Sequence, residues 1–346
     1  MSATDAASRG ASPADFETFG DYGDYLRKSE RANPGARAQP RQDGEFVRPR
    51  YRFQGRITAD GSSGYRAEPG RYHLYISWAC PWAQRTAIVR KLTGLEEVVS
   101  LSAVDPVRDG RGWAFREGAG HGLDPVNSFA LLREAYEATE PGYDGHVSVP
   151  VLWDRQEHRI VSNNFPDITI DLATQFGDLA SGGAGLYPEA LRPSIDAINA
   201  MVYQNVNNGV YRAGFAGNQV AYHEAVGALF ATLDELERHL EDRRYLLGGS
   251  VTEADVRLWV TLARFDLVYY SHFKASIRRL TDYPNLWGYA RDLYTLPAFR
   301  ETTNFDHIKR HYFMTHPHLN PSRIVPEGPQ LGWDGPHDRA RLASRR

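Results

Sequence analysis

The sequence predicts an α/β domain followed by an all-α domain. Three observations support this fold class. First, strand-like and helix-like patterns alternate after residue 70. Second, no convincing strand pattern follows a Gly- and Ser-containing linker at 177–188. Third, the composition is that of an ordinary globular chain, with 42% hydrophobic and 24% charged residues. At 346 residues the chain is long enough for about two domains. We divide it into an N-terminal arm at 1–70, an α/β domain at 71–180, an all-α domain at 189–330 and a tail at 331–346.

The α/β domain is predicted from the order of its elements. Its first strand lies at residues 72–77, where Tyr72, Leu74 and Ile76 occupy alternate positions. The elements that follow are a helix at 83–92, a strand at 98–104, a helix at 128–138, strands at 149–152 and 159–162, and a helix at 166–175. A mixed sheet with flanking helices satisfies this order, and a thioredoxin-like unit is the smallest fold that has it.

The all-α domain is predicted from one long helical pattern and one helix start. Apolar residues recur at i, i+3 and i+4 through residues 225–240, and Gly248-Gly249 is expected to end that helix. Thr252 and Asp255 then form a capping box, with Asp in the position usually held by Glu. This capping role explains two side chains that resemble catalytic groups.

Charge and hydropathy exclude several classes of function. The 40 basic residues nearly balance 43 acidic ones, so the net charge of −3 gives no drive toward nucleic acid or an anionic membrane. No apolar run is long enough to span a membrane, and the first 20 residues lack the basic start and apolar middle of a signal peptide. We therefore expect a cytoplasmic protein that binds neither nucleic acid nor membrane.

The cysteine and histidine patterns argue against a metal centre. Cys80 is the only cysteine, so no intramolecular disulfide and no zinc site built on paired cysteines can form. His307 and His311 lie one helical turn apart, but no third ligand stands at a recognisable metalloenzyme spacing. We predict no metal and no bound cofactor.

Cys80 is the strongest candidate for chemistry. It follows a predicted strand and precedes a predicted helix, with Pro81 in the first helical turn. Free backbone amides and the positive end of the helix dipole are expected to lower the thiol pKa and to populate the nucleophilic thiolate. The alternative is a buried, inert cysteine. Because the fourth position of the motif is Ala83 and not a second cysteine, a mixed disulfide on Cys80 must be cleared by an external small thiol.

Val149 and Pro150 stand at the start of the third predicted strand. A proline there removes a donor from the strand ladder. We expect a cis peptide bond that turns the backbone groups of Val149 outward beside the cysteine, with an ordinary edge-strand proline as the alternative.

Residues 71–86, RYHLYISWACPWAQRT, resemble the active-site segment of the glutathionyl-hydroquinone reductases, the Xi class of glutathione transferases. The resemblance covers most of residues 45–330. Other segments that resemble the family lie at 112–115, 147–154, 160–163, 208–216, 264–266, 307–312 and 320–321. The resemblance implies a thioredoxin-like domain, a glutathione-transferase all-α domain and a homodimer.

The resemblance also implies a reaction. A cysteine thiolate attacks the sulfur of a glutathionyl-hydroquinone, the hydroquinone leaves, and a second glutathione releases the mixed disulfide. By the matching motifs Cys80 is the nucleophile, and Trp113 with the Val149-Pro150 segment holds the thiol. Tyr211 and Tyr312 face the aromatic quinone-type substrate and donate to its oxygen. The alternative function is a non-catalytic binding or regulatory protein that reuses the fold.

One pair of residues departs from the family pattern. The family continues Glu-Ser where this chain has Asn164-Phe165, and those two side chains grip the γ-glutamyl end of glutathione. One interpretation is sequence drift, with glutathione still bound by other groups. The other is a different thiol, such as mycothiol, contacted by Asn164 and Phe165. The sequence leaves the thiol as either glutathione or mycothiol.

Overall fold

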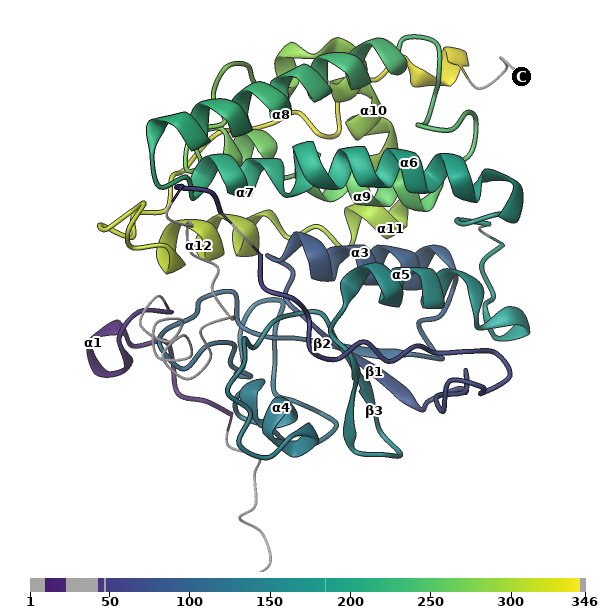
Figure 1. The fold of residues 1–346 in the computed structure, drawn as a ribbon, viewed down its shortest axis with the longest axis vertical. Coiled ribbons are helices and arrows are strands. Elements are labelled where there is room, and N and C mark those ends of the chain that lie inside the picture. Colours follow the sequence, from purple (N-terminus) through teal and green to yellow (C-terminus); the bar gives the residue numbers. More distant parts are fainter. Residues whose placement is uncertain (1–9, 23–42, 47, 184, 343–346) are drawn as a thin grey trace, which may run out of the picture.

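The computed structural model describes residues 10–22, 43–46, 48–183 and 185–342. Residues 1–9 and 23–42 of the predicted arm, and 343–346 of the predicted tail, lie outside the described residues. Figure 1 shows the sheet at one end of the molecule and the C-terminal helices at the other, with α3 and α5 between them. The N-terminal half therefore contacts the C-terminal half through α3 and α5 and not through its sheet.

Four strands form one mixed sheet in the described part of the chain. They are β1 (Tyr72–Ile76), β2 (Ser100–Ala103), β3 (Val151–Asp154) and β4 (Arg159–Ser162), in the spatial order β2-β1-β3-β4. β1 pairs parallel with β2 and antiparallel with β3, and β3 pairs antiparallel with β4. A parallel pair needs a crossover, which α3 (Pro81–Leu92) supplies, so the predicted thioredoxin-like order is confirmed.

All five residues of β1 are buried, although the sequence suggested two different faces. His73 shows how a polar residue is accommodated there. Its two ring nitrogens each lie 2.7 Å from a serine hydroxyl, of Ser100 and of Ser102 on β2. Burial lowers the pKa of His73 to about 3, so the ring is neutral and adds no charge to the core.

Several boundaries in the first half differ from the sequence predictions. The helix predicted at 128–138 is α4 (Arg133–Thr139), because Ser128 has a left-handed backbone with φ 57° and cannot belong to a helix. β3 begins at Val151, so Val149 and Pro150 precede the strand. α5 spans Phe165–Thr174. A short helix, α1 (Phe16–Phe19), belongs to the predicted arm and is capped by the Asp15 carboxylate.

The C-terminal half is helical, and no strand occurs among the described residues after β4. Its helices are α6 (Arg192–Val202), α7 (Gly209–Gly214), α8 (Gln219–His239), α9 (Glu253–Leu262), α10 (Pro284–Tyr294), α11 (Pro297–Arg300) and α12 (Phe305–Thr315). The prediction that Gly248-Gly249 ends the long helix is wrong. α8 ends at His239, and Gly248, at φ 117°, closes a separate turn by pairing with Tyr245.

The segment predicted as a flexible linker is anchored to both halves. The Gly182 amide donates to the Thr93 carbonyl at 2.9 Å, and the Leu186 carbonyl accepts from the Glu253 amide at 2.8 Å. Leu186 itself is buried. An apolar side chain and backbone hydrogen bonds therefore fix this connection at the start of α9.

The capping box at α9 is confirmed. The Asp255 carboxylate accepts the Thr252 amide at 2.7 Å, and its other oxygen accepts the Leu246 amide and the Tyr289 hydroxyl, each at 2.9 Å. Asp255 is fully buried. It thus joins the start of α9 to α10, which is a structural role.

Candidate active site

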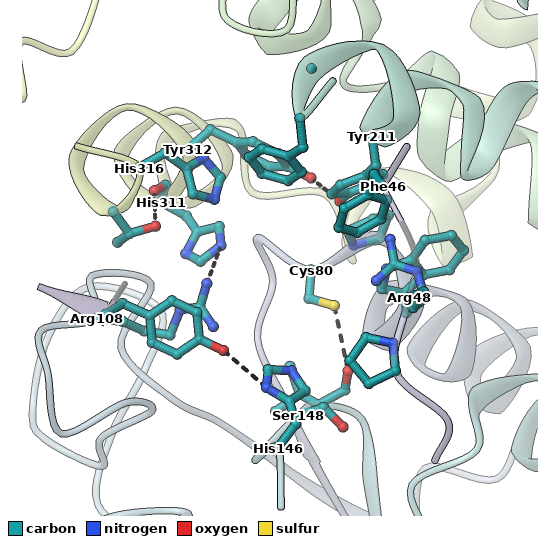
Figure 2. A pocket seen from close by; sticks show the side chains of 18 of the residues that line it. Phe46, Arg48, Cys80, Arg108, His146, Ser148, Tyr211, His311, Tyr312 and His316 are labelled. Atoms are coloured by element: carbon teal, nitrogen blue, oxygen red, sulfur yellow. Dashed lines mark hydrogen bonds between the residues drawn. The ribbon is translucent and has the colours of Figure 1, made fainter. Parts of the chain in front are cut away.

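A cavity of about 500 Å³ lies where the two halves meet. Its lining includes the predicted site residues Cys80, Trp113, Val149, Tyr211 and Tyr312. Figure 2 shows the Cys80 sulfur at the centre of this cavity, with the tyrosine pair on one side and Arg108 and His146 on the other. The fold thus brings together residues from the β1–α3 connection, the loop after β2, the loop before β3, α7 and α12.

Cys80 is the N-cap residue, immediately before α3. Its backbone is extended, with φ −79° and ψ 119°, and its Sγ lies 3.5 Å from the carbonyl oxygen of Val149. Arg264 holds the preceding turn from the other half of the molecule. It donates to the carbonyls of Ala79 and Trp78 at 3.1 and 3.0 Å. The position of the thiol therefore depends on both halves.

The prediction of a lowered Cys80 pKa is wrong for the protein alone. Burial raises the pKa of the thiol. The amides of Ala83 and Trp82 and the guanidinium groups of Arg264 and Arg48 lower it, but desolvation of the anion is the larger effect. The helix start is present as predicted, but its effect on the thiol pKa is smaller than that of desolvation.

The peptide bond between Val149 and Pro150 is cis, as predicted. Val149 lines the cavity and its carbonyl faces the Cys80 thiol, whereas Pro150 is buried and does not line it. Trp113 lines the cavity beside His311, with ring centroids 5.2 Å apart and planes 15° from parallel.

The two predicted tyrosines meet in a network that the sequence did not reveal. The Tyr211 and Tyr312 hydroxyls lie 2.5 Å apart, and the Tyr269 hydroxyl lies 2.9 Å from that of Tyr312. Burial raises the pKa of all three, so their hydroxyls stay protonated and can donate. Tyr269 belongs to a π-helical turn, Phe265–Tyr269. Because this turn departs from α-helical spacing, the sequence pattern did not predict that Tyr269 would lie beside Tyr312.

Asn164 and Phe165 do not line this cavity. The Asn164 amide donates to the Asp167 carboxylate at 2.7 Å. Phe165 is 1% exposed and stacks on Trp82, with centroids 4.6 Å apart. The guanidinium of Arg85 lies 4.9 Å from the Phe165 ring. Both side chains are engaged within the protein, and the adjacent Asn163 is the one that reaches the cavity.

Several cavity residues had no functional signal in the sequence. They are Arg48 and Phe46 from the segment before β1, Arg108 from the loop after β2, and His146 and His316. They come from segments far apart along the chain. His311 also lines the cavity, although the sequence had raised it only as a metal ligand. Within the described ranges, no group of three or more His, Cys, Asp or Glu side chains is arranged to hold a metal ion. The described helices include none that is long and apolar enough to cross a membrane.

A thioredoxin-like sheet with a thiol at the first helix, followed by an all-α half, defines the glutathione transferase class. In agreement, residues 219–292 match the family model for the glutathione S-transferase C-terminal domain.

Whole-chain comparisons narrow the class to a family. The chain is 46% identical over 303 residues to glutathionyl-hydroquinone reductase YqjG of Escherichia coli, covering 86% of this chain and 92% of that relative. The glutathione-bound structure of YqjG superposes with a TM-score of 0.81 at 47% identity, covering 83% of this chain and 96% of that one. The Xi transferase of Phanerochaete chrysosporium gives a TM-score of 0.83 at 46% identity, covering 87% and 97%. The chain belongs to the glutathionyl-hydroquinone reductase family, the Xi class of glutathione transferases.

Proposed function

We propose that this protein is a reductase that cleaves S-conjugates of hydroquinones through a mixed disulfide on Cys80. One observation carries the proposal: the Cys80 thiol and the Tyr211–Tyr312 pair line the same cavity. A nucleophilic sulfur and phenol donors are the two groups that cleavage of an aromatic carbon–sulfur bond needs. The names of relatives such as YqjG support the same activity.

In the first half-reaction the Cys80 thiolate attacks the sulfur of the conjugate. A sulfur–sulfur bond forms to Cys80 and the bond between that sulfur and the ring carbon breaks. The electron pair of the broken bond goes to the aromatic system, which takes up one proton and leaves as the hydroquinone. Tyr211 or Tyr312 donates to the oxygen on which negative charge builds up.

In the second half-reaction an external thiol attacks the Cys80 mixed disulfide. The small-molecule disulfide leaves and the Cys80 thiol is restored. The chain can supply no second sulfur of its own, because Cys80 is its only cysteine. Each turnover therefore consumes one molecule of the external thiol, and the other sulfur of the disulfide product comes from the conjugate itself.

We further propose that this thiol has no γ-glutamyl group, mycothiol being an example. Asn164 and Phe165 stand where the family has the Glu-Ser pair. The Asn164 amide is bonded to Asp167, and Phe165 is stacked on Trp82. Neither presents a carboxylate or hydroxyl to a γ-glutamyl ammonium.

The experiment that tests the function compares the wild-type protein with Cys80→Ser. We expect the serine variant to keep its circular dichroism spectrum and to lose hydroquinone release from a conjugate. Mass spectrometry of the wild type, treated with conjugate and no free thiol, should show one thiol adduct on Cys80. A serine variant that keeps more than about a hundredth of the wild-type rate would rule out a cysteine nucleophile. A wild-type protein that binds the conjugate without adduct or product is a binding protein and not a reductase.

A further inference from the structure

Arg108 is a buried cation that lines the cavity, and no described residue gives it an acidic partner. Its side chain is 7% exposed, and within the described residues it makes no ion pair and its Nε has no hydrogen-bond partner. Arg71, with a similar exposure of 8%, shows the usual arrangement, since its guanidinium lies 2.7 Å from the Asp154 carboxylate. A buried charge is costly unless it is paired, so Arg108 calls for an explanation.

Among the described residues, the groups that contact Arg108 are uncharged. Its guanidinium lies 3.5 Å from the centre of the Tyr22 ring and 4.2 Å from that of Trp113. One nitrogen lies 3.4 Å from Nε2 of His311, whose Nδ1 is 2.7 Å from the Pro106 carbonyl. Because a carbonyl only accepts, Nδ1 of His311 carries the proton and Nε2 receives the bond from Arg108. Burial and Arg108 hold the His311 pKa well below its usual value, so the ring is neutral.

The rest of the cavity wall does not supply the missing negative charge. Among the described residues, the lining holds Arg48, Arg50 and Arg108 and no Asp or Glu. A buried nitrogen of Arg48 also has no hydrogen-bond partner there. Burial is the largest cause that lowers the pKa of His146 to about 3, and the charges of Arg108 and Arg48 lower it further, so the ring is neutral. Figure 2 places Arg48 and Arg108 on opposite sides of Cys80.

We propose that Arg108 is a substrate-binding residue that pairs with a carboxylate on the ligand. Aromatic contacts and His311 fix the guanidinium. Within the described residues its buried Nε has no hydrogen-bond partner, and the cavity that Arg108 lines holds no Asp or Glu. A carboxylate would complete the charge balance through charge-assisted hydrogen bonds. The glycine end of a peptide thiol and an acidic substituent on the aromatic ring are two sources of this group. The proposal rests on the reductase function for its meaning, but its test measures binding alone.

The test uses Cys80→Ser protein, in which no chemistry occurs, and isothermal titration calorimetry at fixed ionic strength. Two pairs of probes differ in one carboxylate each. The first is S-methylglutathione and its glycine ethyl ester, and the second is 2,5-dihydroxybenzoate and benzene-1,4-diol. Each is titrated into the Cys80→Ser background and into the same background with Arg108→Gln, Arg108→Lys or Arg278→Gln. Arg278 is the matched control, since it forms a surface ion pair with Asp234.

We expect Arg108→Gln to weaken binding of the carboxylate member of at least one pair by about 10- to 150-fold, and its uncharged partner by less than about twofold. Arg108→Lys should retain part of the affinity, and Arg278→Gln all of it. If affinity is lost selectively for S-methylglutathione, the carboxylate that pairs with Arg108 belongs to the thiol. If it is lost selectively for 2,5-dihydroxybenzoate, the carboxylate belongs to the aromatic ligand. Equal weakening within both pairs, or none, would overturn the proposal. Thermal unfolding of each variant identifies a loss of affinity caused by misfolding, which Arg108→Lys avoids.

Discussion

The hydroxyl oxygens of Tyr211 and Tyr312 lie 2.5 Å apart, although 101 residues separate them along the chain. Tyr211 comes from α7 and Tyr312 from α12, and Tyr269 joins them through its own hydroxyl. Two protonated phenols at this distance share one hydrogen bond, which leaves a second proton free to point into the cavity. In the proposed reaction this proton would be donated to the developing oxyanion.

Removing either hydroxyl should therefore slow the reductive half-reaction. We expect Tyr211→Phe and Tyr312→Phe each to lower hydroquinone release by about 10- to 1000-fold, the scale of one lost oxyanion donor. Stopped-flow measurement of thiol exchange on a pre-formed Cys80 mixed disulfide should change far less. Tyr187→Phe, which removes a hydroxyl bonded to Asp196 outside the cavity, is the control. Equal losses in both half-reactions would mean that the pair is structural.

Tyr269 should act as a positioning residue. Its hydroxyl contacts Tyr312, and it is not among the residues that line the cavity. Tyr269→Phe removes one neutral hydrogen bond, so we expect the reductive step to slow by about 2- to 10-fold. Combined with Tyr312→Phe, the second substitution should add little, because the hydroxyl it would orient is already absent. Independent, multiplying effects would contradict this role.

The pH dependence of thiol alkylation should report the raised pKa of the half-buried Cys80 thiol. Burial raises its pKa, so the thiol is mostly protonated at neutral pH. Because Cys80 is the only cysteine, alkylation by iodoacetamide measures this group alone. We expect the rate to rise with pH and to level off above pH 8.5, the ordinary cysteine value. Arg48→Gln should move the midpoint higher, since that guanidinium lowers the pKa. A midpoint below about pH 7 would show instead that the helix start controls the thiol.

Thr252 and Asp255 should affect stability and not chemistry. We expect Thr252→Ala to lower the free energy of unfolding by about 1 kcal/mol, as for a lost N-cap. Asp255→Ala should cost about 3 kcal/mol or more, because the buried amides of Thr252 and Leu246 and the Tyr289 hydroxyl each lose an acceptor. Urea unfolding measures both values. A normal unfolding curve with lost turnover would assign these residues to the reaction.

The choice of thiol should follow from Asn164 and Phe165. Without a charged partner for the γ-glutamyl group, we expect glutathionyl conjugates to show a kcat/KM about 10- to 150-fold below that of mycothiol conjugates. Replacing the pair by Glu-Ser should improve the glutathionyl conjugate selectively. Steady-state assays with both conjugates of one hydroquinone decide the matter, and equal efficiency would restore glutathione as the thiol.

The order of strands and helices was readable from the sequence because it depends on local periodicity. Apolar spacing located β1 and α8, Pro81 marked the start of α3, and the Thr252–Asp255 pair marked that of α9. Ends of elements were less well predicted. α8 stops nine residues before Gly248, because the chain must leave the helix to bring Leu246 against Asp255.

The sequence by itself determined the fold, the family and the thiol at the start of a helix, since each follows from residues that are neighbours along the chain. Tertiary structure decided what surrounds that thiol. The higher pKa of Cys80 results from burial between the two halves. The Tyr211–Tyr312 hydrogen bond joins two helices that are distant in sequence. The surroundings of Phe165 and Arg108 likewise consist of residues remote in sequence. Desolvation and long-range charge depend on distances in space, which local sequence patterns do not contain.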